Sequence, residues 1–380
     1  MDVYLDNAAT SWPKPETVYQ AVDHFMREIG ATPGRGGHRR EEEAQRLADE
    51  TRAALAQLFN ALDPQGIAFT LNATQAINMA LKGLLRPGDH VLTSAIEHNA
   101  TWRPLKALEK RGVELGVIPC APDGTLNPAD VEVSFRPNTR LVAMLHASNV
   151  LGAILPIAEV GEIAHRHSAI LLVDAAQTAG AYPIDMQAMG IDLLAFAGHK
   201  GTYGPHGTGG LVTRSGVELE TWVEGGSGFL SRPDAMPEEL PARLEAGTQN
   251  AAGIAGLLAG VRFVLDAERG VERIRAHEMA MAARLIEQLQ AVPGLSILGP
   301  QDLQRRTAVV AITVQGYVPD QLAAVLDKVF GVATRAGLHC APQAHRAAGT
   351  LEYGALRFSP GYFNTAEEID YAVQSLQNAL

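Results

Sequence analysis

The chain has 380 residues, 47% of them hydrophobic, and a formal net charge of −11. This length allows two or three domains with sizeable cores. The acidic balance, without a long Lys/Arg run, argues against nucleic acid or an anionic membrane as the main partner. Because there is no apolar run of about 18 residues and no secretory-type N-terminus, we expect a cytoplasmic protein without a membrane span.

The cysteine count sets a further limit. Cys120 and Cys340 are the only cysteines. Two cysteines cannot build a disulfide framework and are too few for a structural zinc site, so we expect no metal. Any part they play is that of single thiols.

Apolar periodicity predicts alternating helices and strands along the chain. The predicted helices cover residues 16–29, 41–59, 75–85, 99–110, 156–167, about 251–268, 271–291, 320–329 and 365–380. The predicted strands cover 66–71, 90–95, 113–118, 141–146, 169–174 and 191–197, with a smaller α/β unit starting near 306–314. Strands that alternate with helices indicate a mostly parallel sheet, which binds ligands at the carboxyl ends of its strands.

Polar side chains follow these predicted strands closely. They are Thr74, His98, Asn149, Asp174, Gln177, His199 and Lys200. Because such residues meet at one edge of a parallel sheet, we expect them to share a site. The residue 31–38 loop, which contains Arg35, either presents donors to an anion or is a plain connection.

Lys200 stands in a glycine-rich turn that follows an apolar strand. A lysine in a dry turn has a lowered pKa and can attack a carbonyl, whereas the alternative is a solvated loop lysine. Asp174 ends the preceding strand and suits a carboxylate that keeps a pyridinium nitrogen protonated. Thr74 opens a helix, where it either donates to a phosphate or simply caps the helix.

The spacing Asp174-x-x-Gln177, followed by Gly198-His199-Lys200, resembles the class V aminotransferase family. That family has the pyridoxal-phosphate fold type I and includes cysteine desulfurases and selenocysteine lyases. The resemblance extends from the segment Tyr-Leu-Asp-Asn-Ala-Ala-Thr at residues 4–10 to Arg357. It implies an α/β fold with a large domain (14–250), built on a mainly parallel mixed sheet flanked by helices, and a smaller C-terminal α/β domain (251–380 with 1–13).

The resemblance also implies roles for the site residues. Lys200 would carry the cofactor aldehyde, Asp174 would pair with the ring nitrogen, and His98 would stack on the ring. The remaining cofactor contacts would be Asn149 and Gln177 near the phenolic oxygen, Thr74 and His199 at the phosphate, and Thr248 at the phosphate of the second subunit in a homodimer.

Two positions depart from the family pattern at the phosphate. Ala197 and Ala73 stand where serine and threonine are common. The two missing hydroxyl donors predict weaker phosphate binding or compensation by the backbone and water. Each lost neutral hydrogen bond is worth about 0.5–1.5 kcal/mol, so we expect lower cofactor affinity without loss of binding.

Cys340 distinguishes between the possible reactions. It lies in Thr-Arg-Ala-Gly-Leu-His-Cys-Ala-Pro (334–342), which resembles the cysteine segment of the SUF-type, group II, desulfurases. There the thiol becomes a persulfide, and we expect His339 or Arg335 to favour its thiolate. The alternative, a buried structural thiol, fits Cys120 better.

Arg357 follows after a short interval and matches the arginine that binds the substrate carboxylate, with Asn149 beside it. The short interval between Cys340 and Arg357 favours the group II form. We therefore expect a desulfurase that converts L-cysteine to L-alanine and passes sulfur to an acceptor protein. The alternatives are a selenocysteine lyase, another class V reaction, or a non-catalytic cofactor-binding scaffold.

Overall fold

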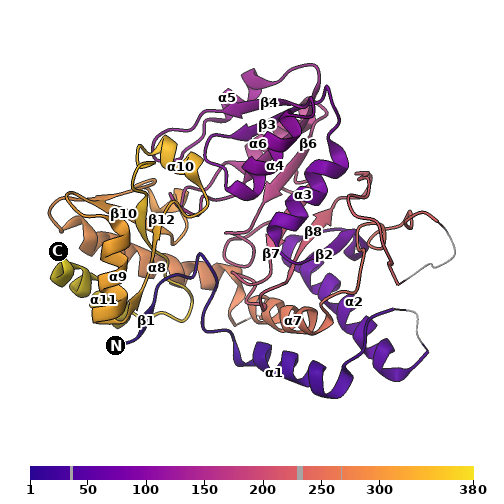
Figure 1. Ribbon diagram of the computed structural model, residues 1–380, viewed down its shortest axis with the longest axis horizontal. Helices are drawn as coiled ribbons and strands as arrows, with labels where there is room; N and C mark the ends of the chain where they lie inside the picture. Colours follow the sequence, from indigo (N-terminus) through magenta and orange to yellow (C-terminus); the bar gives the residue numbers. More distant parts are fainter. Residues whose placement is uncertain (35–36, 229–233, 267) are drawn as a thin grey trace.

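The computed structural model describes residues 1–34, 37–228, 234–266 and 268–380, and Arg35 therefore lies outside the described residues. Figure 1 shows a larger α/β unit around one sheet, with a smaller unit beside it. The larger unit has a seven-stranded sheet, and the smaller has a four-stranded sheet. No helix within these ranges is long and apolar enough to cross a membrane.

The large sheet has the strand order β2-β8-β7-β6-β5-β3-β4. Its strands are β2 (Ile67–Thr70), β3 (His90–Ser94), β4 (Glu114–Ile118), β5 (Thr139–Leu145), β6 (Ile170–Asp174), β7 (Leu193–Ala197) and β8 (Gly209–Thr213). Strands β3 to β7 pair in parallel, whereas β8 runs antiparallel to both β7 and β2. The expected mainly parallel, mixed sheet is thus confirmed.

Strand β8 has no counterpart among the predicted strands because its sequence begins with two glycines. A Cβ atom on Gly210 would lie 2.6 Å from the Phe196 ring of the neighbouring strand. Glycine is required there because the backbone and an aromatic ring approach closely. Gly210 therefore fits the sheet, but it weakens the β-branched pattern by which a strand is predicted from sequence.

Helices cover both faces of the large sheet. They are α2 (Arg39–Phe59), α3 (Ala73–Leu84), α4 (Asn99–Glu109), α5 (Pro128–Ser134), α6 (Ile157–Arg166) and α7 (Ala251–Leu265). One core joins α3 and α4 to Leu193 and Ala195 of β7, and the other joins α2, α6 and α7 to Leu194 and Phe196. Because successive residues of a strand face opposite sides, a continuous apolar strand serves both cores.

Helix α1 (Glu16–His24) continues into a π-helical turn, Phe25–Ile29, and ends at Gly30 with φ +57°. It packs against α7 at the outer edge of the large unit. Helix α2 begins at Arg39, earlier than predicted, because the His38 side chain accepts a hydrogen bond from the Glu41 backbone N–H. Such capping extends a helix into residues whose apolar pattern is weak.

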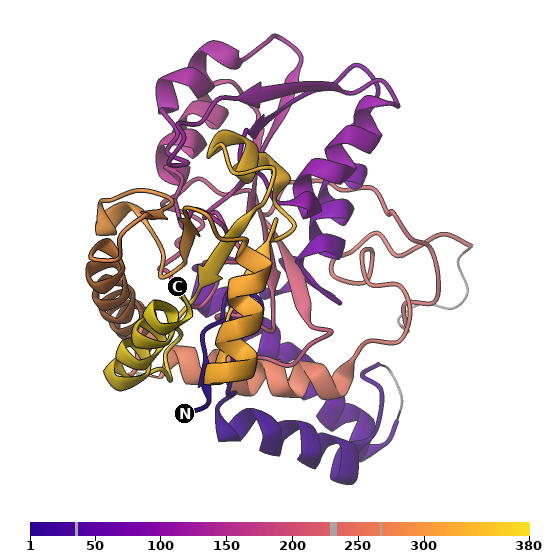
Figure 2. The same ribbon diagram turned by 60° about the vertical axis from the view of Figure 1, so that its left-hand side comes forward.

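The small unit combines an antiparallel sheet with three longer helices and one short helix. Its strands are β9 (Leu295–Ile297), β10 (Val310–Val314), β12 (Arg335–Gly337) and β13 (Ala355–Phe358), and its helices are α8 (Gly270–Gln290), α9 (Pro319–Phe330), α10 (Pro342–Ala347) and α11 (Ala366–Ala379). The N-terminal strand β1 (Val3–Tyr4) pairs in parallel with β11 (Val332–Ala333). Figure 2 shows both chain ends beside α9 and α11. The domain limits at 13/14 and 250/251 stay a prediction.

A buried ion pair joins α2 to the segment before α7. Arg52 and Glu245 are 4% and 5% exposed, and Arg52 Nη2 lies 2.8 Å from both carboxylate oxygens. Arg52 Nε also donates to the Ile67 carbonyl, and the Phe69 N–H donates to Glu245 Oε1. Both ions therefore keep several hydrogen bonds, as charges removed from water require.

We predict that Glu245→Ala lowers the free energy of unfolding by up to about 3–5 kcal/mol, because it leaves the buried Arg52 charge with only the half-exposed Asp49, 3.5 Å from its Nη1, as counter-ion. The matched control is Asp23→Ala, which removes the exposed Arg27–Asp23 pair. An exposed pair contributes about 0–1 kcal/mol. Urea denaturation of both variants measures the difference, and equal losses would contradict the prediction.

Candidate active site

The strand ends of the large sheet surround a cavity of about 230 Å³. The predicted site residues that line it are Thr74, His98, Asn149, Asp174, Gln177, His199 and Lys200. Ala73 and Ala197, the two departures from the family pattern, line it as well. Three other predicted residues, Thr248, Cys340 and Arg357, do not.

Lys200 is held in a tightly folded turn after β7. A Cβ atom on Gly198 would lie 2.1 Å from Thr208 Oγ1, and one on Gly201 would lie 2.5 Å from the Ala179 carbonyl oxygen. Only glycine permits these backbone approaches. Burial lowers the pKa of Lys200 to about 8, although the Asp174 carboxylate opposes the shift. Its amine is thus far closer to neutrality at pH 7 than an ordinary lysine.

The N-terminal segment holds this turn from the other side, which the sequence analysis missed. The His199 carbonyl accepts hydrogen bonds from Thr10 Oγ1 at 3.0 Å, Ser11 N at 3.2 Å and Lys14 Nζ at 2.7 Å. Ser11 Oγ donates to the Lys200 carbonyl at 2.9 Å. Burial lowers the pKa of Lys14 to about 8. The backbone on both sides of the His199–Lys200 peptide is therefore fixed by residues far away in the sequence.

Asp174 ends β6 and His98 follows β3, and β5 lies between these two strands. Asp174 is 6% exposed, and its Oδ1 accepts a hydrogen bond from the Ala176 N–H at 2.9 Å. His98 is the N-cap of α4, and its Nδ1 accepts from the Ala100 N–H at 3.0 Å. Burial lowers the pKa of His98, so that its ring is neutral at pH 7 and carries its proton on Nε2.

Glu97, next to His98, is a further acid that sequence reasoning did not single out. It is fully buried and accepts hydrogen bonds from Ser94 Oγ at 2.6 Å and from the Leu145 N–H at 3.0 Å. Burial raises its pKa to about 8. These bonds tie the turn that carries His98 to the end of β5. The signal in the sequence was an acidic residue directly after an apolar strand.

Anion-binding groups gather at the start of α3. The Asn72 side chain caps this helix by accepting from the Gln75 N–H at 2.9 Å, and Thr74 follows in the first turn. Nearby, His199 Nδ1 is buried and has no hydrogen-bond partner among the described residues. Burial lowers the pKa of His199 to about 3, which keeps its ring neutral. A helix N-terminus with an unused ring nitrogen beside it suits a phosphate.

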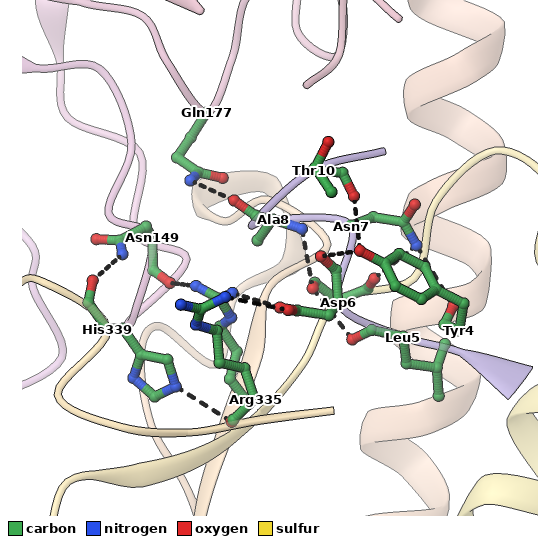
Figure 3. Close-up of polar contacts among 12 residues, drawn as sticks. Tyr4, Leu5, Asp6, Asn7, Ala8, Thr10, Asn149, Gln177, Arg335 and His339 are labelled. Carbon is green, nitrogen blue, oxygen red and sulfur yellow. Dashed lines mark hydrogen bonds and ion pairs between the residues drawn. The ribbon is translucent and has the colours of Figure 1, made fainter. Parts of the chain in front are cut away.

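Asn149 connects the cavity to the small unit. Its Nδ2 donates to the His339 carbonyl at 2.7 Å, and its own carbonyl accepts from Arg357 Nη1 at 3.0 Å. Its Oδ1 is buried without a partner in the described part of the chain. Gln177 Nε2 donates to the Ala8 carbonyl at 3.0 Å. Figure 3 shows Asn149 and Gln177 reaching toward His339 and Ala8.

Arg357 lies behind this connection rather than in the cavity wall. It is 2% exposed, and its Nη2 forms an ion pair with Asp6 Oδ1 at 2.7 Å. Asp6 also lies 3.5 Å from Arg335 Nη1. The sequence analysis did not single out Asp6, because nothing local in the sequence predicts its distant partners.

Cys340 is exposed, whereas Cys120 is half-buried and burial raises the Cys120 pKa to about 12. The exposed thiol lies in a strained loop, in which His339 and Cys340 have φ angles of +50° and +56°. The Cys340 carbonyl accepts from the Asn99 N–H at 2.8 Å, which places the loop beside His98.

Of the two residues expected to favour the Cys340 thiolate, His339 and Arg335, the structure argues against His339. Burial lowers the pKa of His339 to about 3, so the ring carries no positive charge at pH 7. Its nitrogens face His345 Nε2 and the Arg335 carbonyl. The positive charge nearest in sequence to Cys340 is therefore on Arg335, and His339 shapes the loop.

Thr248 is exposed and lies outside the cavity that contains Lys200. It borders a separate hollow with Arg52 and Glu245. Within one chain it does not complete the phosphate end of the site.

The whole chain resembles known proteins. Residues 3–372 match the family described as aminotransferase class-V. The chain belongs to this family. A relative from Methanothermobacter thermautotrophicus, named "Probable cysteine desulfurase", is 37% identical, and the match covers 99% of this chain and 94% of the relative.

Two solved structures show the same fold. The apo cysteine desulfurase of Thermococcus onnurineus NA1 superposes with a TM-score of 0.92 at 33% identity, covering 99% of this chain and 94% of that one. The cysteine desulfurase CsdA from Escherichia coli gives a TM-score of 0.89 at 29% identity, covering 100% and 94%. The expected fold type I and the expected pyridoxal-phosphate dependence of the class V family are confirmed.

We predict that the acetylation rate of Lys200 in the cofactor-free protein rises with pH and reaches half of its maximum near pH 8, because the pKa of Lys200 is lowered to about 8. Because the Asp174 carboxylate opposes this lowering, Asp174→Asn moves the midpoint to lower pH. Peptide mass spectrometry after brief acetic anhydride treatment measures both midpoints, with the exposed Lys110 as internal reference. A midpoint near pH 10 in the parent protein, or a rise in the variant, would contradict this assignment.

Proposed function

We propose that this protein is a pyridoxal-phosphate-dependent cysteine desulfurase that converts L-cysteine to L-alanine. The observation that carries the proposal is the combination of a buried amine, Lys200, and a buried acid, Asp174, in one cavity, with the exposed Cys340 loop joined to Asn99 at its edge. The amine and acid suit the cofactor, and the exposed thiol suits sulfur transfer.

The residues present fit the cofactor. Two buried atoms, His199 Nδ1 and Asn149 Oδ1, have no hydrogen-bond partner among the described residues and can bind a polar group, and the N-terminus of α3 can bind an anion. We assign the phosphate to Thr74 and His199, the ring nitrogen to Asp174, the ring face to His98, and the region of the phenolic oxygen to Asn149 and Gln177. When bound, pyridoxal phosphate supplies an electron sink for charge that develops on the substrate.

Each catalytic side chain then has a defined task. Lys200 Nζ holds the cofactor at rest, and it removes and returns the proton on the substrate Cα, which its lowered pKa permits near neutral pH. The Asp174 carboxylate would pair with the ring nitrogen and favour its protonated form. The neutral ring of His98 stacks without adding charge.

Cys340 is the group that takes the sulfur from the substrate. The Cys340 thiolate attacks the sulfur of L-cysteine, the Cβ–S bond breaks, and its electron pair stays on carbon. Protonation of that carbon leaves L-alanine, and Cys340 becomes a persulfide. Arg357 and Asn149 hold the substrate carboxylate, since a guanidinium matches a carboxylate in charge and shape.

The persulfide then passes to an acceptor protein, and we assign the chain to the SUF-type, group II, form. The compact loop between β12 and α10, together with the short interval to Arg357, supports that assignment. We propose a homodimer in which Thr248 of one subunit reaches the phosphate of the other. Thr248 is exposed and does not line the cavity of its own chain, and both observations support this arrangement. The cytoplasmic location stays a prediction.

A selenocysteine lyase is the second candidate, since selenocysteine fits the same groups. The exposed thiol favours the desulfurase, because a selenocysteine lyase has less need of Cys340. A non-catalytic scaffold would not require the acid at the ring nitrogen. Turnover of L-cysteine and of selenocysteine, measured side by side, separates these functions.

We predict that Cys340→Ala abolishes the mass gain of one sulfur on the protein and the formation of alanine from cysteine, because no thiolate takes the sulfur. The cofactor absorbance remains, since Cys340 does not line the cavity. Cys120→Ala is the matched control and keeps both activities. If Cys340→Ala continued to release alanine from cysteine, the assigned task of Cys340 would be rejected.

We predict that Ala197→Ser increases the affinity for pyridoxal phosphate by about two- to tenfold, because one hydrogen bond is worth about 0.5–1.5 kcal/mol. Ala197 lines the cavity at the end of β7. The control, Ala195→Ser, places a hydroxyl two residues earlier on β7, outside the cavity lining, and should not increase the affinity for pyridoxal phosphate. Absorbance titration of the cofactor-free proteins measures both, and an unchanged Ala197→Ser variant would contradict a missing hydroxyl donor.

A further inference from the structure

Asp6 lies between two arginines of very different exposure. Its Oδ1 is 2.7 Å from Nη2 of Arg357, and its Oδ2 is 3.5 Å from Nη1 of Arg335. The Arg357 side chain is 2% exposed, whereas that of Arg335 is 53% exposed. The two oxygens of one carboxylate are thus shared between a buried cation and a solvated one, and Figure 3 shows Asp6 beside Arg335.

The guanidinium of Arg357 already has protein partners. One Nη donates to the Asn149 carbonyl and the other to Asp6, while Nε is buried without a partner among the described residues. Asp6 is the acidic side chain that forms an ion pair with Arg357 in the described part of the chain. A ligand carboxylate that reaches Arg357 therefore meets a cation whose charge Asp6 has neutralised.

The cluster as a whole still has room for one anion. Two arginines and one aspartate leave one excess positive charge. Two carboxylates against the same buried guanidinium would repel each other strongly in a site of low dielectric. The repulsion disappears if Asp6 pairs with Arg335 alone, because each cation then has its own carboxylate.

The backbone of Asp6 is fixed, so that this exchange requires only a side-chain rotation. Asp6 bridges to Ser359, the Asn7 N–H donates to the Ser359 carbonyl, and the Tyr4 hydroxyl donates to the Asp6 carbonyl at 3.2 Å. The carboxylate has two side-chain torsions and is already within 3.5 Å of its second partner.

We propose that Asp6 is an internal competitor for Arg357, which the substrate carboxylate displaces onto Arg335. Asp6 and Arg335 together then set the affinity for the carboxylate of the substrate. The inference rests on the proposed function only in taking Arg357 as the carboxylate-binding residue.

The test uses the holoenzyme and two small ligands that lack an amine. Propionate carries a carboxylate, and propionamide is its neutral counterpart of nearly equal size. Asp6→Asn removes the competing charge but keeps an oxygen that can accept from Arg357. Isothermal titration calorimetry should show that propionate binds about three- to tenfold more tightly to Asp6→Asn, because the excess positive charge is no longer shared. Propionamide binding should not change.

Arg335→Gln completes a double-mutant cycle at an exposed position. In the parent protein it removes the second partner of Asp6, so propionate binding weakens by about two- to fivefold. In the Asp6→Asn background, Arg335→Gln does not change propionate affinity, since residue 6 then has no carboxylate that Arg335 could receive. This coupling distinguishes an exchange from a direct contact between Arg335 and the ligand, which would weaken binding equally in both backgrounds.

Several outcomes would overturn the inference. Weaker propionate binding by Asp6→Asn would show that Asp6 only positions Arg357. An equal effect of Arg335→Gln in both backgrounds would also reject it. Unchanged propionate binding by Arg335→Gln in the parent protein would reject it as well, and that result does not depend on how Asp6→Asn folds. If these binding results hold while L-cysteine is not desulfurated, only the proposed function fails; if desulfuration is normal but the coupling is absent, only this inference fails.

Discussion

The removal of the Lys200 amine from water, beside a fixed negative charge on Asp174, is the interaction on which the site depends. Burial lowers the lysine pKa to about 8, and the carboxylate limits that fall. Both groups stand at the ends of adjacent strands of one sheet. A parallel sheet places such residues together without long loops, so the fold supplies the position and the dry surroundings supply the reactivity.

Local pattern was sufficient to predict the elements that carry most of the candidate site. The continuous apolar runs before Asp174 and Lys200 predicted β6 and β7, because strands covered on both faces have few polar residues. The expected phosphate site at Thr74 followed from the turn between a predicted strand and a predicted helix. Strand β8 was not predicted, because the Phe196 ring leaves room only for glycine at Gly210 and glycine is no strand signal. Helix α5 was not predicted either, although Asn127 and Pro128 form a typical helix start.

Contacts between distant segments could not be predicted from the sequence. The bonds from Thr10, Ser11 and Lys14 to the Lys200 turn depend on how the N-terminal segment crosses the large unit. The neutral state of His339 depends on its burial against His345, whereas the sequence alone suggested a positive neighbour for Cys340. Periodicity describes the surroundings of one element, and these properties arise where separate elements meet.

The parallel pairing of β1 with β11, together with the bridge from Asp6 to Ser359, has a consequence for biosynthesis. Val3 and Asp6 can find these partners only after Val332 and Ser359 have been translated. The large sheet, whose last strand in chain order ends at Thr213, can assemble before these partners have been translated. A fragment that ends before Ala355 lacks Arg357 and Ser359, so that neither the ion pair nor the bridge of Asp6 can form in it.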